Sequence, residues 1–204
     1  MGPGMNDLKS IDLSALLRET VLTPQLVVPK ITGLNLSRRS LLMGLALMTA
    51  LNAIVYAITG HLYPPQDPAV QTMYAPIVHT PLLFAGFMYV VLALVSKFIA
   101  SFGQSIGGTA RYEDILALII WIQALRLIVS LIALVFTAIT PGLTSLFTLG
   151  AGIWGMYIHI VFVDEAHGFY DKIKAAILTV LTYLGVTMTI VFSLMAVLFI
   201  IFGA

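Results

Sequence analysis

The stretch "GGTARYEDILALIIWIQALRLIVSLIALVFTAIT" runs from Gly107 to Thr140 and decides the class of fold. Between Ile115 and Ile139 it holds a single charged residue, Arg126. A helix needs roughly 20 apolar residues to cross the hydrocarbon core of a bilayer, so this segment is long enough to span a membrane. A guanidinium at that depth costs at least ~2.5–3.5 kcal/mol on insertion scales. We therefore expect Arg126 to face protein, water or a polar headgroup.

The composition of the whole chain agrees with a membrane protein. Of its 204 residues, 60% are hydrophobic and only 9% are charged, and the mean hydropathy is +1.04. Soluble domains carry about 25% charged residues. The chain has no cysteine, which excludes disulfides and thiolate metal sites. An all-α, polytopic membrane protein is the class that fits.

We predict five membrane-spanning helices, because backbone inside a bilayer must be almost entirely helical. The predicted spans are residues 41–59, 77–95, 115–139, 143–163 and 175–202. Pro141 and Gly142 are expected to join the third and fourth spans as a tight hairpin, and residues 60–76 to form an outer loop. Residues 1–4 ("MGPG") read as an expression remnant, residues 5–40 as a cytoplasmic and interfacial segment, and residues 41–204 as one membrane domain.

The positions of lysine and arginine predict the orientation, because these residues accumulate in cytoplasmic loops. All of them except Arg126 fall on the side of the N-terminus: Lys9, Arg18, Lys30, Arg38, Arg39, Lys97, Arg111, Lys172 and Lys174. The opposite connections, residues 60–76 and 140–142, contain none. We therefore predict a cytoplasmic N-terminus and a C-terminus outside.

A short amphipathic helix is expected before the first span. Leu13, Leu16, Leu17 and Val21 recur at helical spacing, and Pro24 ends the pattern. Such a helix is typical of segments that lie on a membrane surface. The alternative, that it packs on the protein's own cytoplasmic loops, stays open.

Arg126 belongs to a polar stripe on the third span. Gln123, Ser130 and Thr137 share its face at offsets of three, four and eleven residues. The acidic residues all lie outside the predicted spans, so no carboxylate is available at its depth. In one interpretation Arg126 donates to amide, hydroxyl and carbonyl oxygens and locks the bundle. In the other it lines a cavity with Gln123, Ser130 and His159 and binds an anion, such as a lipid phosphate.

A second polar group follows the fourth span. It contains four weak candidates for metal ligands: His159, Asp164, Glu165 and His167. Their spacing matches no established metal motif, so we predict no metal site. Asp171 is expected to cap the fifth helix. The chain has no nucleophile elbow, phosphate-binding loop or zincin pair, and we expect neither enzyme activity nor a cofactor.

A turn is predicted between the second and third spans. Gly107 and Gly108 permit a positive φ angle. Thr109 is expected to cap the helix that follows, and Glu113 and Asp114 suit the dipole of its first turns.

Several pieces of this sequence together resemble one family. They are "TPQLVVPKI" at residues 23–31, "FGQSIGGTARYEDILAL" at 102–118, "WIQ" at 121–123, Pro141-Gly142, and "AHGFYDKIKAAILTVLTYL" at 166–184. The chain resembles the bacterial branch of the Yip-domain family of Ypt/Rab-interacting membrane proteins. The resemblance implies a five-span fold with a cytoplasmic N-terminus. The Asp-Leu-Tyr-Gly-Pro motif of eukaryotic members is missing, so binding of a Rab-type GTPase is not carried over.

The function expected from these observations is non-enzymatic. We expect a scaffold or adaptor in the cytoplasmic (inner) membrane of a bacterium that organises membrane lipids or partner proteins. The protein partner could be a second copy of the chain, and no nucleic acid is expected. A permease or lipid-translocating protein with a polar path around Arg126 is the alternative.

Overall fold

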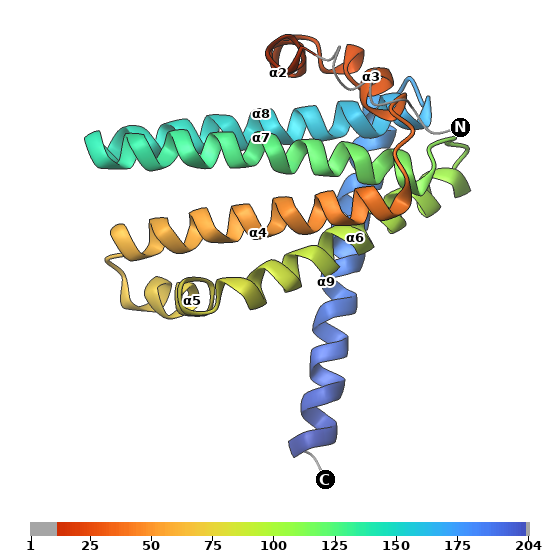
Figure 1. Cartoon of the computed structure of the whole chain (residues 1–204). Helices are drawn as coiled ribbons and strands as arrows, with labels where there is room; N and C mark the ends of the chain where they lie inside the picture. The colour runs from red at the N-terminus through yellow and green to blue at the C-terminus, as the bar shows by residue number, and fades with distance from the viewer. Residues whose placement is uncertain (1–11, 203–204) are drawn as a thin grey trace.

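The structure of the protein is a computed structural model that describes residues 12–202 (Figure 1). Every regular element in that range is helical. The predicted expression remnant at residues 1–4 lies outside the described residues. Within the described range, the all-α prediction is confirmed.

Five of the helices are long and apolar enough to cross a membrane. They are α4 (Arg38–Leu62), α6 (Pro81–Ser105), α7 (Tyr112–Ile139), α8 (Pro141–His167) and α9 (Lys172–Phe202). The shorter elements are α2 (Leu13–Leu22), η1 (Pro24–Leu26), α3 (Val28–Thr32) and α5 (Pro68–His79). The number of candidate spans therefore agrees with the sequence prediction.

The second span was predicted too early in the chain. Residues 77–79 belong to α5, which ends before Pro81, and α6 then runs to Ser105 rather than stopping at Val95. A proline disfavours helical geometry in the residue before it, which explains the break at Thr80. Lys97 does not end the helix, because its side chain is exposed and a long aliphatic stem lets the charge reach a polar surface. The predicted outer loop was also wrong, since most of α5 lies within it.

The third and fourth spans form the predicted hairpin, with an even shorter link. Thr140 alone separates α7 from α8. Pro141 is the first residue of α8, where its missing N–H is no loss because the first helical N–H groups have no partner within the helix. Gly142 is already helical.

Helix α7 is the centre of the bundle. It packs against α4, α6 and α8, and its hairpin partner α8 also contacts α9 (Figure 1). The largest group of buried apolar residues lies where these helices meet and includes Leu45, Val95, Ile99, Leu116 and Leu178. Many apolar side chains on the outer faces remain exposed, as expected of helices that contact lipid.

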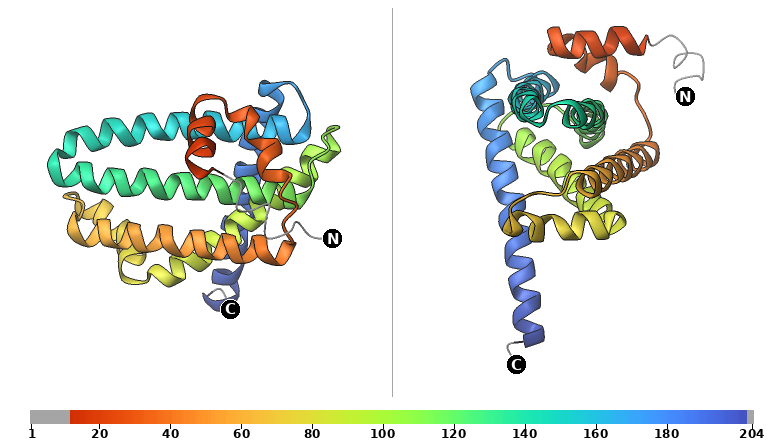
Figure 2. Two further views of the ribbon diagram at one scale, coloured as in Figure 1. Left: turned by 45° about the horizontal axis from the view of Figure 1, so that its top comes forward. Right: turned by 90° about the vertical axis from the view of Figure 1, so that its left-hand side faces the viewer.

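Helix α9 runs across the hairpin rather than alongside it. In the right-hand view of Figure 2, α7 and α8 are seen end-on while α9 is seen along its length. Among its described side chains, the buried ones, which include Ala175, Leu178 and Val186, lie in its first half. The second half extends away from the bundle, and Phe192 and Phe199 in it are 69% and 73% exposed.

The lengths of the helices are compatible with this splayed arrangement. Helix α7 has 28 residues and α9 has 31, which correspond to roughly 42 and 46 Å at 1.5 Å per residue. The hydrocarbon core is only about 30 Å thick. Two helices that diverge this strongly can cross one bilayer only if both are tilted, and their extra length accommodates such a tilt.

The predicted amphipathic helix is present as α2. Asp12 caps it by accepting hydrogen bonds from the backbone N–H groups of Ser14 and Ala15. The Ser14 hydroxyl also donates to this carboxylate, and together these bonds hold the pKa of Asp12 below its usual value.

Two indole groups attach α2 to the flank of the hairpin. Trp121 Nε1 on α7 donates to Thr20 Oγ1 at 3.0 Å, and Trp154 Nε1 on α8 donates to the carbonyl of Val21 at 3.1 Å. Thr20 is fully buried, whereas Leu13 is 59% exposed. Helix α2 is thus tied to membrane helices α7 and α8, and its Leu16 also packs with Val27 and Val28 of the segment that follows it.

Replacement of Thr20 by valine tests this attachment. Valine keeps the shape of the side chain but leaves the partly buried Trp121 N–H without its acceptor on Thr20, which costs ~1–3 kcal/mol. We expect limited proteolysis of residues 12–22 in detergent to become at least tenfold faster. The control is Leu13→Ala, which changes an exposed residue of the same helix and should leave the rate unchanged. Equal rates for wild type and Thr20→Val would show that the indole bond does not hold α2.

Candidate functional site

A polar seam joins α4 to α7. The Asn52 amide Nδ2 donates to the backbone carbonyl of Gln123 at 3.1 Å and to that of Met48 at 2.9 Å. Asn52 and Gln123 are both only 6% exposed. The bond between them crosses the interface of the two helices, and it fixes their register.

Arg126 faces a phenol one turn farther along this seam. Its Nε and Nη2 atoms donate to Tyr56 Oη at 3.1 and 2.7 Å, and its guanidinium carbon lies 5.4 Å from the centre of the Tyr56 ring. The edge of the Phe84 ring on α6 meets that ring in turn, with centres 6.2 Å apart. An arginine has five N–H donors, so two donations leave several unused. The side chain is exposed, and these unused donors are open to a ligand.

The other members of the predicted stripe have separate surroundings. Ser130 is half-buried, and its hydroxyl makes no hydrogen bond with another described side chain. Thr137 donates to Thr144 Oγ1 on α8 at 3.2 Å. The stripe therefore contacts α4 through Gln123 and Arg126 and contacts α8 through Thr137.

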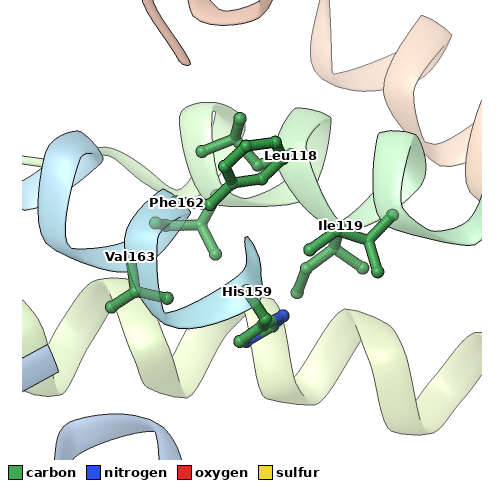
Figure 3. Close-up of a pocket in the computed structure, with 7 residues that line it drawn as sticks. Leu118, Ile119, His159, Phe162 and Val163 are labelled. Atoms are coloured by element: carbon green, nitrogen blue, oxygen red, sulfur yellow. The ribbon is translucent and has the colours of Figure 1, made fainter. Parts of the chain in front are cut away.

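His159 lies on α8, where it faces α7 and also the Tyr183 ring of α9. Its Nε2 is buried without a hydrogen-bond partner among the described residues, and its ring centre is 5.8 Å from that of Tyr183. It borders a cavity of about 10 Å³ that is otherwise lined by apolar side chains, including Leu118, Ile119 and Phe162 (Figure 3). That volume is at the lower limit for one water molecule, and the lining offers such a water only one polar group. No hydrogen bond or ring contact of the described residues joins His159 to Arg126.

The four weak metal candidates do not form a cluster. Among the described residues, no three His, Asp or Glu side chains stand close enough to hold one ion. Asp164 instead accepts a hydrogen bond from the backbone N–H of Asp171 at 2.9 Å, and Glu165 is exposed. Asp171 Oδ1 accepts from the N–H groups of Ile173 and Lys174, so it caps α9 as predicted.

The most tightly packed feature near these residues is a corner formed by residues 103–109 and 164–174. The His167 imidazole is 1% exposed and stacks on Phe169 with ring centres 4.9 Å apart. It sits against the backbones of Gly103 and Gly108, where any Cβ atom would overlap the ring. The sequence assigned Gly107 and Gly108 to a turn with positive φ, but of these two only Gly107 has a positive φ, at 91°. Gly108 is instead needed because the His167 ring lies directly against its backbone.

The capping prediction for α7 was wrong. Arg111 is the N-cap residue, and its backbone N–H donates to Asp114 Oδ2 at 3.0 Å. Thr109 instead donates through both its N–H and its hydroxyl to the carbonyl of His167, at 3.1 and 3.3 Å. It therefore joins the α6–α7 turn to the end of α8, a role that local sequence does not reveal.

Comparison with known families identifies this architecture. The profile of the Yip1 domain matches residues 21–203. The chain belongs to the Yip1-domain family. A search of curated proteins and a search of solved structures each gave no match.

The sequence pieces that resemble the Yip1 domain meet in space. The piece at 102–118 contains Gly103 and Gly108, and the piece at 166–184 contains His167, which fills the space between them. The piece at 121–123 supplies the indole that holds α2 and the carbonyl that accepts from Asn52. These Yip1-domain pieces therefore mainly supply contacts between helices.

Replacement of Gly103 by alanine tests the packing around His167. The added Cβ overlaps the ring, and overpacking of this kind costs ~1–3 kcal/mol or more. We expect a clear fall in the melting temperature in detergent. The matched control is Gly86→Ala in the same helix, where a Cβ meets open space and alanine is the better helix former by up to ~1 kcal/mol.

A second substitution separates this clash from other effects. In the Gly103→Ala background, His167→Ala removes the ring and should restore part of the lost melting temperature, although His167→Ala alone is destabilising. Equal stability of Gly103→Ala and Gly86→Ala would contradict the packing described here.

Proposed function

We propose that this Yip1-domain membrane protein is a non-enzymatic scaffold or adaptor that organises lipids or partner proteins. The observation that carries the proposal is the splay of α9 from the α7–α8 hairpin. Both arms start at the corner of residues 103–109 and 164–174, and each presents apolar side chains along its length. A rigid corner with two divergent apolar arms offers lipids or membrane helices a wide surface of fixed shape.

The polar groups inside the bundle support a structural rather than a catalytic role. The amide of Asn52 and the hydroxyls of Thr20 and Thr137 are engaged in contacts between helices. His159 and His167 are buried among apolar atoms and backbone. A general acid or base must reach the proton that it transfers, and both imidazoles are enclosed, with exposures of 9% and 1%.

We place the protein in the cytoplasmic membrane of a bacterium with its N-terminus inside. The orientation rests on the lysine and arginine distribution, since residues 60–76 and 140–142 contain none. The protein lacks cysteine, so single cysteines report position without background. Asp67→Cys should react with an impermeant thiol reagent added to intact cells, whereas Glu165→Cys should react only after permeabilisation. The reverse pattern would contradict this orientation.

The alternative function is permeation or lipid translocation along a path beside Arg126. It is favoured by one feature, the exposed guanidinium whose described hydrogen-bond acceptor is Tyr56 alone. Its unused N–H groups suit a phosphate, which arginine binds through two parallel hydrogen bonds. The scaffold proposal instead treats Arg126 as a structural link between α4 and α7.

Replacement of Arg126 by methionine distinguishes the two functions. Tyr56 loses charge-assisted hydrogen bonds worth ~1.5–3 kcal/mol each, partly offset by easier insertion of α7. If Arg126 is a link, Arg126→Met lowers the melting temperature equally in phosphatidylglycerol and phosphatidylcholine. If it binds phosphate, wild type is more stable in phosphatidylglycerol, Arg126→Met abolishes the difference, and Arg126→Lys restores part of it.

The scaffold proposal further predicts that lipid exchange between leaflets does not depend on Arg126. Wild type and Arg126→Met in vesicles should give the same slow rate in a fluorescent-lipid translocation assay. Rapid translocation by wild type that Arg126→Met abolishes would overturn the scaffold proposal in favour of the alternative.

A further inference from the structure

Two exposed histidines that are far apart in the sequence meet at the end of the bundle opposite the His167 corner. His61 lies in the last turn of α4, and His79 is the last residue of α5. Their ring centres are 6.0 Å apart and their planes differ by 78°. Neither imidazole makes a hydrogen bond with another described residue, so both retain a nitrogen lone pair for a ligand.

This spacing is close to that of two imidazoles that share one metal ion. Each coordinating nitrogen lies about 2.0–2.1 Å from a zinc ion, and tetrahedral angles then place the ring centres roughly 5 Å apart. A closure of about 1 Å lies within the reach of rotations about exposed side-chain bonds. The large angle between the planes allows the two lone pairs to converge, whereas stacked parallel rings could not direct them at one point.

We propose that His61 and His79 form a two-histidine site for an exchangeable divalent transition-metal ion, of which zinc, nickel and copper suit imidazole best. Water molecules fill the remaining positions of the ion. Structural zinc sites use four protein ligands, so a site with two binds more weakly and releases its ion more readily.

The bound ion would bridge α4 and α5, which also pack against each other. Residues 63–67 join α4 to α5 without helical structure, and Thr80 separates α5 from α6. A ligand from each helix therefore fixes the direction of α5 relative to α4. This inference is independent of the scaffold proposal, because neither histidine belongs to the corner or to the polar seam.

The histidine content of the chain makes the site easy to isolate experimentally. The chain has four histidines. The other two, His159 and His167, are 9% and 1% exposed and lie in the packed interior. Metal ions added to the folded protein therefore meet His61 and His79 as the accessible imidazoles.

The test is a titration of the full-length protein, without a polyhistidine tag, with zinc chloride in detergent. Calorimetry should give saturable binding of one ion per chain, and the melting temperature should rise with zinc concentration because the ion binds the folded state. His61→Ala and His79→Ala should each abolish both effects while the melting temperature without zinc stays unchanged. Thr72→Ala, an exposed change on α5, should bind zinc like wild type.

Three results would overturn the proposal: absence of saturable binding, equal binding by wild type and either alanine variant, or a stoichiometry of one ion per two chains. A double variant, His61→Cys with His79→Cys, checks the geometry without metal. In a chain that has no other cysteine, a short bifunctional thiol reagent should link the two positions within one molecule. Failure to link them while each single cysteine variant is labelled would contradict the juxtaposition of α4 and α5.

Discussion

The arrangement of the helices depends on one contact: the His167 ring packs between the backbones of two glycines. The ring comes from the end of α8, Gly103 comes from α6, and Gly108 lies in the turn that leads into α7. Because both glycines lack a Cβ, the three segments approach more closely than any other residue type would permit. Hydrogen bonds from Thr109 to the His167 carbonyl and from Lys174 Nζ to the Ile106 carbonyl add further ties. Four helices are thereby fixed at one point.

Beyond that point, the direction of each helix depends on the other helices that it packs against. Helix α7 meets α4, and the bond from Asn52 to the Gln123 carbonyl sets their register. Helix α8 follows α7 because Thr140 alone links them. Helix α9 packs against α6 and α8, and among its described residues Ile190 is the last that packs against the core. Beyond Ile190 its described apolar side chains are exposed, and lipid or another membrane helix must cover them.

Features that depend on local composition could be predicted from the sequence, and features that depend on distant partners could not. The long apolar runs predicted five spans, because a helix in the hydrocarbon core of a bilayer needs roughly 20 apolar residues whatever its partners are. Lys97 misled the prediction of the second span, since the sequence does not reveal that a lysine within a helix can extend its charge to a polar surface. Thr109 has the chemistry of a helix cap, but its partner is the His167 carbonyl, 58 residues later. For the same reason the sequence predicted a polar stripe that contains Arg126 but could not select Tyr56 as the acceptor of its hydrogen bonds.

The attachment of α2 also constrains the order in which the protein is assembled. Thr20 and Val21 are held by indoles that follow them by 101 and 133 residues. Contacts between residues so far apart in the sequence form late, because the long stretch of chain between them must be ordered before the contacts can stabilise it. During synthesis the N-terminal segment therefore emerges first and finds its place last, after both arms of the hairpin are in the membrane. Until then its apolar residues are accessible to chaperones and proteases, so protection of this segment requires that α7 and α8 are already in place.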